Sequence, residues 1–335
     1  MLHATWLMLH GRWLLLHGVW LLLHALAASA GFCCTHRLSR YTVQSLRTAM
    51  PNRRQFLKAS LACFATASAF VWTGPALAQR PAFARMALAR LAFDLSEPHR
   101  LTSSTQRIVS FIEEARLSGA EVVVFPELAL GGLLYSNGGS SDAWWTSPLT
   151  ARDYPAALET LRRAAQSAGI DVFFGGVEFS EGKLYNSVFL ASRSGQLNPV
   201  ARKGVYFANV LGSEYFSAGH LPTEEDLVTI AGRRTLAVVC ANILAEPLLH
   251  RIDTLAPELV VVLANWWDDP NAPSPLLTNA VERLSLHGRT VLLSNFLVPG
   301  GLTPLLAMTN GKLLKVDTRQ EEGLLLVELP FRATH

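Results

Sequence analysis

The sequence predicts an α/β fold, and two observations support that prediction. Apolar runs of strand length alternate with longer segments in which apolar residues recur every three or four positions, as in an amphipathic helix. Strands and helices that alternate along a chain are typical of α/β domains. Residues 79–335 also contain no Ser/Gly-rich tract, charge block or internal repeat, so we expect one domain there.

Each predicted element has a local signal. The segment 103–117 places Ile108, Ile112 and Ala115 on one helical face, and Gly119 ends it. Strands are predicted at 86–94, 121–125, 171–177, 184–191, 234–239, 259–263 and 290–294, and helices at 103–117, 155–168, 247–255 and 275–287. Turns are predicted at Gly182 and at Asn310-Gly311, the latter between short strands in the tail 305–329.

The first 78 residues differ in composition from the rest. They contain no Asp or Glu, and without their seven basic side chains the formal charge changes from +3 to −4, with 22 basic against 26 acidic side chains. Arg53-Arg54 precedes an apolar run at 59–72 and the small-residue motif Ala76-Leu77-Ala78, an order that resembles a twin-arginine export signal. We expect a signal peptide at 50–78 and a periplasmic or secreted mature chain, 79–335.

Residues 1–49 leave two interpretations open. Histidine recurs every seven residues in Leu- and Trp-rich sequence, at positions 3, 10, 17 and 24. One interpretation is a histidine-lined transmembrane or interfacial helix. The other, which we favour, is low-complexity upstream sequence with Met50 as the true start, because an export signal works near an N-terminus.

The composition of 79–335 limits the classes of partner. A mildly acidic domain gives no electrostatic reason to expect nucleic acid or an anionic membrane as a partner. Cys240 is the one cysteine in this range, and a lone cysteine is either a small buried apolar side chain or a reactive thiol. With scattered histidines and one cysteine, the sequence shows no residue spacing characteristic of a zinc site.

Three side chains suited to nucleophilic catalysis follow strand-like runs, where the loops of α/β sheets form active sites. Glu127 follows Phe125-Pro126, and Cys240 follows the run 235–239. A thiol attacks as the thiolate, so it needs a base, which Glu127 could supply, and a cation for the developing oxyanion, which Lys203 could supply. Taken singly, Glu127 and Lys203 are more typical of solvated surface residues than of catalytic ones.

Together these residues resemble the carbon–nitrogen hydrolase (nitrilase) family. The matching segments occur in the family's order along nearly all of 79–335. They are 119–127 with Phe125-Pro126-Glu127, Tyr185-Asn186-Ser187, Arg202-Lys203, 214–219, Cys240 after its strand, and Asn265-Trp266-Trp267. The resemblance implies an α-β-β-α sandwich that assembles into homo-oligomers.

The resemblance also implies roles for individual residues. Glu127 is expected to be the general base and acid, Lys203 the oxyanion stabiliser, Cys240 the nucleophile, and Glu214 a second acid that positions the lysine or the substrate. The substrate is a small amide, carbamoyl compound or nitrile, and no cofactor is needed. The predicted substrate-binding residues are Tyr135, Asn242, Asn265 and Trp266.

Other functions remain as alternatives. The loop at 265–267, with Glu282-Arg283-Leu284, also resembles the catalytic domain of apolipoprotein N-acyltransferases, in which an amine accepts the acyl group. A non-catalytic binding protein that retains the fold is a second alternative, and a papain-like pair of Cys240 with His250 or His287 is a third. The chain departs from the family at Ala241 and Asn242, where an aromatic and then an acidic residue are common.

Replacing Arg53 and Arg54 by lysine should leave the precursor in the cytoplasm, because a twin-arginine signal depends on the arginine pair. Cell fractionation and the size of the chain measure the outcome. Unaffected export of the double variant would contradict the predicted signal.

Overall fold

A computed structural model describes residues 83–92, 100–131, 148–205, 216–266, 268, 271, 275–298 and 301–330. All of them fall within one compact unit, 80–335. The predicted upstream segment and signal peptide, together with Tyr135, Glu214 and Trp267, lie outside the described residues.

The first sheet contains the strands that precede Glu127 and Lys203. Its strands are β1 (Phe83–Arg90), β2 (Val122–Val124), β3 (Asp171–Ser180), β4 (Lys183–Ala191), β5 (Leu197–Arg202) and β12 (Gly323–Pro330). They are ordered β12-β1-β2-β3-β4-β5. β1, β2 and β3 are parallel, and two successive antiparallel pairings give β5 the same direction as β3. The ends of β2 and β5 therefore lie at the same edge of the sheet.

The second sheet contains the strand that precedes Cys240. Its strands are β6 (Val228–Ile230), β7 (Arg233–Val239), β8 (Leu259–Leu263), β9 (Thr290–Ser294), β10 (Leu305–Thr309) and β11 (Lys312–Asp317). They are ordered β11-β10-β9-β8-β7-β6. β7, β8 and β9 are parallel and fully paired, so the residues that follow these three strands leave at one edge. A 3₁₀ turn, η4 (Cys240–Leu244), begins directly after β7.

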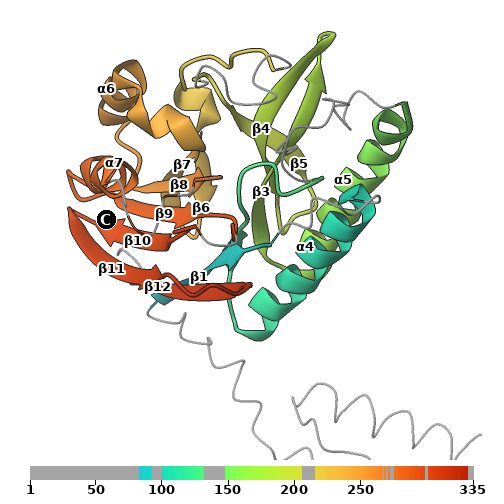
Figure 1. Ribbon diagram of the computed structural model, residues 1–335, viewed down its shortest axis with the longest axis horizontal. Coiled ribbons are helices and arrows are strands. Elements are labelled where there is room, and N and C mark those ends of the chain that lie inside the picture. The colour runs from blue at the N-terminus through green and yellow to red at the C-terminus, as the bar shows by residue number, and fades with distance from the viewer. Residues whose placement is uncertain are drawn as a thin grey trace, which may run out of the picture. The chain divides into compact units, whose positions relative to one another are not determined.

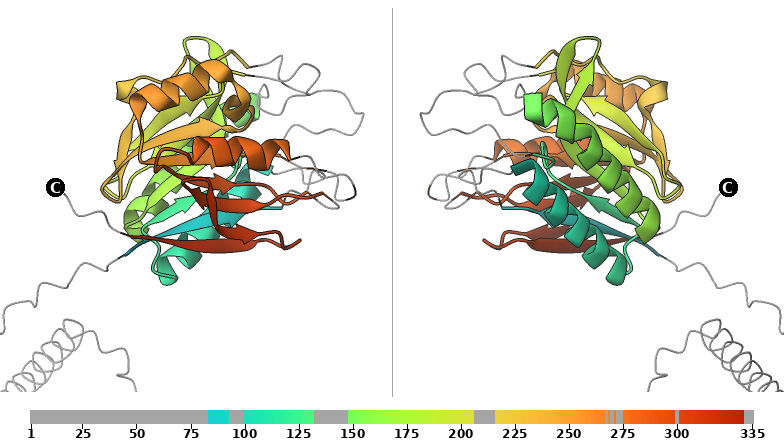
Figure 2. Two further views of the ribbon diagram at one scale, coloured as in Figure 1. Left: turned by 90° about the vertical axis from the view of Figure 1, so that its left-hand side faces the viewer. Right: turned by 90° about the vertical axis from the view of Figure 1, so that its right-hand side faces the viewer.

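Helices cover the outer faces of both sheets, which gives the expected α-β-β-α sandwich (Figure 1). Helices α4 (Arg100–Leu117) and α5 (Pro148–Ala168) lie side by side against the first sheet, as Figure 2 shows in green. Helices α6 (Glu246–Leu255) and α7 (Leu276–Leu284) cover the second sheet. Within the described residues, no helix is long and apolar enough to cross a membrane.

Apolar side chains fill the space between the sheets and the space beneath α4 and α5. Met86, Val124 and Phe173 of the first sheet pack in one cluster with Val238 and Val262 of the second. The opposite face of the first sheet packs against the helices in a second cluster. Because both faces of its parallel strands β1, β2 and β3 are buried, the central residues of these strands are mostly apolar, which is why the strands could be recognised.

The structure corrects several predicted bounds. Helix α5 begins at Pro148, two turns before the predicted start at Pro155, which lies inside the helix. The preceding residue, Tyr154, is buried and joins this part of the helix to the sheet, because its hydroxyl oxygen accepts a 2.7 Å hydrogen bond from the backbone N–H of Val177 in β3. Helix α7 ends at Leu284 rather than 287, and His287, which was expected inside the helix, instead adopts a left-handed φ of 60°. Strands β5 and β6 were not predicted.

Gly175 in β3 lies against the backbone that carries Glu127. A methyl group there would contact the backbone nitrogen of Leu128 and approach the Cα of Glu127 to 2.7 Å. Backbone atoms cannot rotate aside as a flexible side chain can, so the chain itself would have to move.

Gly175→Ala should lower the free energy of unfolding by about 3 kcal/mol, measured by urea denaturation. Gly182→Ala is the control, because its added methyl group meets no atom within 4 Å. In this control the only cost is that of holding alanine in the left-handed conformation that Gly182 adopts, about 1–2 kcal/mol. Equal losses in the two variants would contradict the close approach at Gly175.

Candidate active site

Glu127 is fixed at the edge of the first sheet, where the chain leaves β2. Pro126 restricts the backbone of Phe125 to an extended form, and Leu128 then turns sharply with a left-handed φ of 52°. The backbone N–H of Glu127 donates a 3.4 Å hydrogen bond to the carbonyl of Ala264, which follows β8 in the second sheet. The Glu127 side chain is 3% exposed, so the prediction of a solvated surface glutamate is excluded.

The Glu127 carboxylate binds Lys203. Lys203 Nζ lies 2.6 Å from Glu127 Oε1, and Asn186 Nδ2 donates a 2.7 Å hydrogen bond to the same oxygen. The lysine backbone is held as well, because its N–H donates to the Asn186 carbonyl and its carbonyl accepts from Gly219. Charges with so little exposure to water are stable only when they are paired, and here the ammonium and the carboxylate compensate each other.

Cys240 reaches the same carboxylate from the second sheet. Its thiol lies close to the Glu127 carboxylate and to the backbone N–H of Asn265, the second residue after the end of β8. Burial raises the pKa of the thiol to about 12, with a further contribution from the negative charge of Glu127, and the nearby Lys203 ammonium offsets part of this rise. The resting thiol is therefore protonated, and its proton faces a carboxylate.

Cys240 adopts an unusual backbone conformation, with a left-handed φ of 39°. A non-glycine residue in this region costs about 1–3 kcal/mol and persists only where the surroundings enforce it. Glu181, Ala231, Ala256, His287 and Asn310 share this conformation at turns and at a helix end, while Leu128 and Cys240 adopt it beside the site. The turn at Cys240 places the thiol at the sheet edge instead of continuing the strand.

Arg202, next to the lysine, is anchored by Glu178, a residue that sequence reasoning did not identify. Arg202 Nε and Nη2 bind the two carboxylate oxygens of Glu178 at 2.9 and 2.5 Å. Ser187 donates a further hydrogen bond to Glu178, and the guanidinium lies 4.1 Å from the centre of the Tyr185 ring. Although burial raises the pKa of Glu178, these hydrogen bonds lower it below its usual value, so Glu178 is ionised.

Asn295, which was also not predicted from sequence, holds the loop that follows β8. Its Oδ1 accepts hydrogen bonds from the backbone N–H groups of Trp266 and Phe296, and its Nδ2 donates to the Trp266 carbonyl at 2.7 Å. Its side chain is fully buried. Asn265 directly precedes Trp266. The side-chain Oδ1 of Asn265 is buried, and no donor among the described protein atoms forms a hydrogen bond with it.

The structure thus brings together Glu127, Lys203, Cys240 and the backbone of Asn265. The side-chain amide of Asn242 contacts the backbone around Lys203, and the Trp266 indole donates to Asp268 at 3.4 Å. Contacts of Asn242, Asn265 and Trp266 with a substrate stay a prediction.

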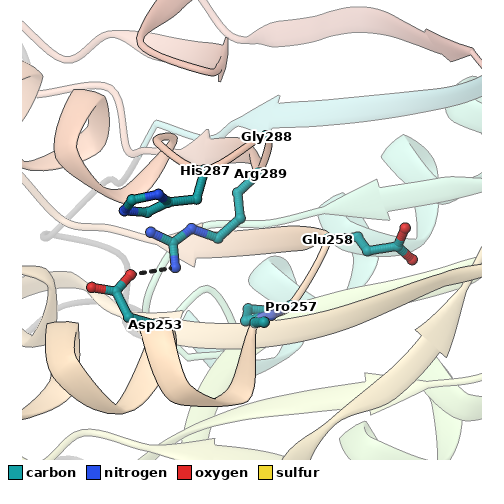
Figure 3. A pocket seen from close by; sticks show the side chains of 7 residues that line it. Asp253, Pro257, Glu258, His287, Gly288 and Arg289 are labelled. Atoms are coloured by element: carbon teal, nitrogen blue, oxygen red, sulfur yellow. Dashed lines mark ion pairs between the residues drawn. The ribbon is translucent and has the colours of Figure 1, made fainter.

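Neither histidine of the papain-like alternative serves Cys240. His250 is exposed on α6, and His287 lies before β9, whereas Cys240 follows the end of the parallel strand β7. His287 lines a cavity of about 300 Å³ together with Asp253, Glu258 and Arg289, and Cys240 is not part of its lining (Figure 3). In that cavity Arg289 forms an ion pair of 2.7 Å with Asp253.

Comparison with known proteins identifies the family. The family model described as carbon-nitrogen hydrolase matches residues 92–266, more than half of the chain, which therefore belongs to the carbon–nitrogen hydrolase family. The 2-oxoglutaramate amidase of Bacillus subtilis (strain 168) is 24% identical over 177 residues. That alignment covers 52% of this chain and 63% of the relative, so it spans less than two thirds of the relative's length.

Solved structures share the fold. An amidase from Nesterenkonia sp. AN1, in complex with butyramide, matches with a TM-score of 0.62 and 20% identity, over 76% of this chain and 94% of that chain. The glutamine-dependent NAD+ synthetase from Acinetobacter baumannii matches with a TM-score of 0.61 and 19% identity, over 73% of this chain and 45% of that chain. At these identities the likeness concerns the fold.

The two charges beside the thiol should shift its titration in opposite directions. Glu127→Gln should lower the pH at which Cys240 is alkylated by iodoacetamide, and Lys203→Met should raise it, each by about one pH unit or more. The alkylated peptide 235–251, which contains no other cysteine, can be quantified by mass spectrometry. Lys183→Met, at an exposed lysine, is the control. Shifts in the same direction would contradict this arrangement.

Proposed function

We propose that the chain hydrolyses small amides through a thioester on Cys240. The observation that carries the proposal is that one buried carboxylate, Glu127, contacts both the thiol and the Lys203 ammonium, with 2.6 Å between Lys203 Nζ and Glu127 Oε1. A protonated thiol, a base within reach of its proton and a cation beside it are the groups that nucleophilic acyl transfer requires.

The proposed reaction uses the same carboxylate in both halves. Glu127 takes the thiol proton as Cys240 Sγ attacks the carbonyl carbon, and Lys203, with the backbone N–H of Asn265, stabilises the oxyanion. The C–N bond then breaks, and Glu127 returns the proton to the departing ammonia or amine. Water, deprotonated by Glu127, attacks the thioester, which releases the carboxylic acid and restores the thiol.

The substrate class is proposed to be primary amides of small acyl groups. Family membership supports cleavage of a carbon–nitrogen bond. The names of similar proteins, an amidase in complex with butyramide and a 2-oxoglutaramate amidase, suggest which amides to test first. Nitriles and carbamoyl compounds are alternative substrates, and Glu214 is the proposed second acid.

Export through the signal at 50–78 and assembly into homo-oligomers are proposed as well. The arginine pair with the apolar run supports export, and the family resemblance supports oligomers.

An ammonia-release assay tests the proposed hydrolysis. The wild-type chain should release ammonia from at least one of butyramide, 2-oxoglutaramate and a carbamoyl amine. Cys240→Ala should reduce turnover by about 10⁴-fold or more, and Lys203→Met by about 10²–10³-fold. Lys183→Met should retain wild-type turnover because this lysine is exposed and pairs with Ser180 at the turn between β3 and β4. Unchanged turnover in Cys240→Ala would refute the nucleophile.

A further inference from the structure

Asn242 connects the turn that carries Cys240 to the loop that carries Lys203. Its Oδ1 accepts hydrogen bonds from the backbone N–H groups of Gly204 and Val205 at 3.0 and 2.9 Å. Its Nδ2 donates to the Arg202 carbonyl at 3.4 Å. One side chain therefore binds the backbone on both sides of Lys203, from a position two residues beyond the thiol in the same 3₁₀ turn.

The amide suits this place for two reasons. Asn242 is 9% exposed, so its own amide oxygen and nitrogen need protein partners, which the backbone around Lys203 provides. An amide also accepts and donates at once, whereas a carboxylate in its place could accept from Gly204 and Val205 but could not donate to the Arg202 carbonyl.

The amide is also neutral, which matters beside this thiol. The groups that act electrostatically on Cys240 are Glu127, which disfavours the thiolate, and Lys203, which favours it. On the helices packed against the turn, Glu246 of α6 pairs with Arg283 of α7, and both are more than half exposed. A carboxylate at 242 would place a second negative charge close to the sulfur and oppose thiolate formation.

We propose that Asn242 is a positioning residue, whose uncharged amide fixes the backbone around Lys203 against the nucleophile turn without adding a second carboxylate beside Cys240. In this proposal Asn242 acts through the lysine loop and not on the substrate, in contrast to the role predicted from sequence. This chain has Asn242 where an acidic residue is common in the family, and in this proposal the amide adjusts the site and does not mark a loss of activity. The kinetic part of the proposal rests on the proposed hydrolysis.

Asn242→Ala and Asn242→Asp test the two parts separately. Asn242→Ala should lower kcat by about tenfold or more, as loss of precise positioning does, while KM changes by less than about threefold. Asn242→Asp keeps the acceptor for both N–H groups, so it should recover most of the lost kcat at alkaline pH. In Asn242→Asp, alkylation of Cys240 by iodoacetamide should require a pH about one unit higher than in the wild type.

Ser285→Ala provides the matched control. Ser285 is a buried hydroxyl that also binds backbone, accepting from Gly311 N and donating to the Glu282 carbonyl, both at 2.8 Å. It lies before β9, at the end opposite to the site, so its loss should lower thermal stability but leave kcat and the alkylation profile unchanged.

Alkylation of the peptide 235–251 needs no substrate, so it remains informative if the wild-type chain hydrolyses none of the amides. A rise in KM alone for Asn242→Ala would overturn the proposal in favour of a substrate contact. An unshifted alkylation profile in Asn242→Asp would overturn the part that concerns charge. If Asn242→Ala fails to fold, the pH profile of Cys240 alkylation and the kcat of Asn242→Asp still test the proposal.

Discussion

The site depends on the buried carboxylate of Glu127, because groups from both sheets meet on it. Lys203 and Asn186 donate to it from the first sheet, and the Cys240 thiol contacts it from the second. Loss of either charge in such a pair leaves the other buried without compensation, which typically costs about 3–5 kcal/mol. The same contacts that give the site its chemistry therefore join the two layers of the fold.

Strand direction explains how residues so distant in the sequence converge. β2, β5 and β7 all end at the site: Lys203 and Cys240 directly follow β5 and β7, and Glu127 comes three residues after β2. Further residues then fix each segment from its neighbours. Glu178 holds Arg202 beside the lysine, Asn242 holds the lysine loop, and Asn295 holds the loop after β8. The reactive groups occupy few positions, and a larger set of buried polar side chains keeps them there.

Much of this arrangement could be predicted from sequence, since the last four residues of β7 and all of β8 are unbroken apolar runs that stop directly before Cys240 and near Asn265. β5 escaped prediction because Pro199 and exposed polar residues interrupt its pattern, which an edge strand tolerates. Glu178 and Asn295 could not be identified, because their partners lie 24 and 29 residues away and local sequence carries no signal of such contacts.

In the proposed reaction, Cys240 carries the acyl group during turnover. Acid quenching within the first turnover of a hydrolysed amide, followed by mass spectrometry of the peptide 235–251, would detect this adduct. The peptide should gain the mass of the acyl group, and adduct formation and decay should slow by about 10²–10⁴-fold in Glu127→Gln. Turnover in the wild-type chain with the acyl group on another residue, or with no adduct at any time, would contradict this reaction.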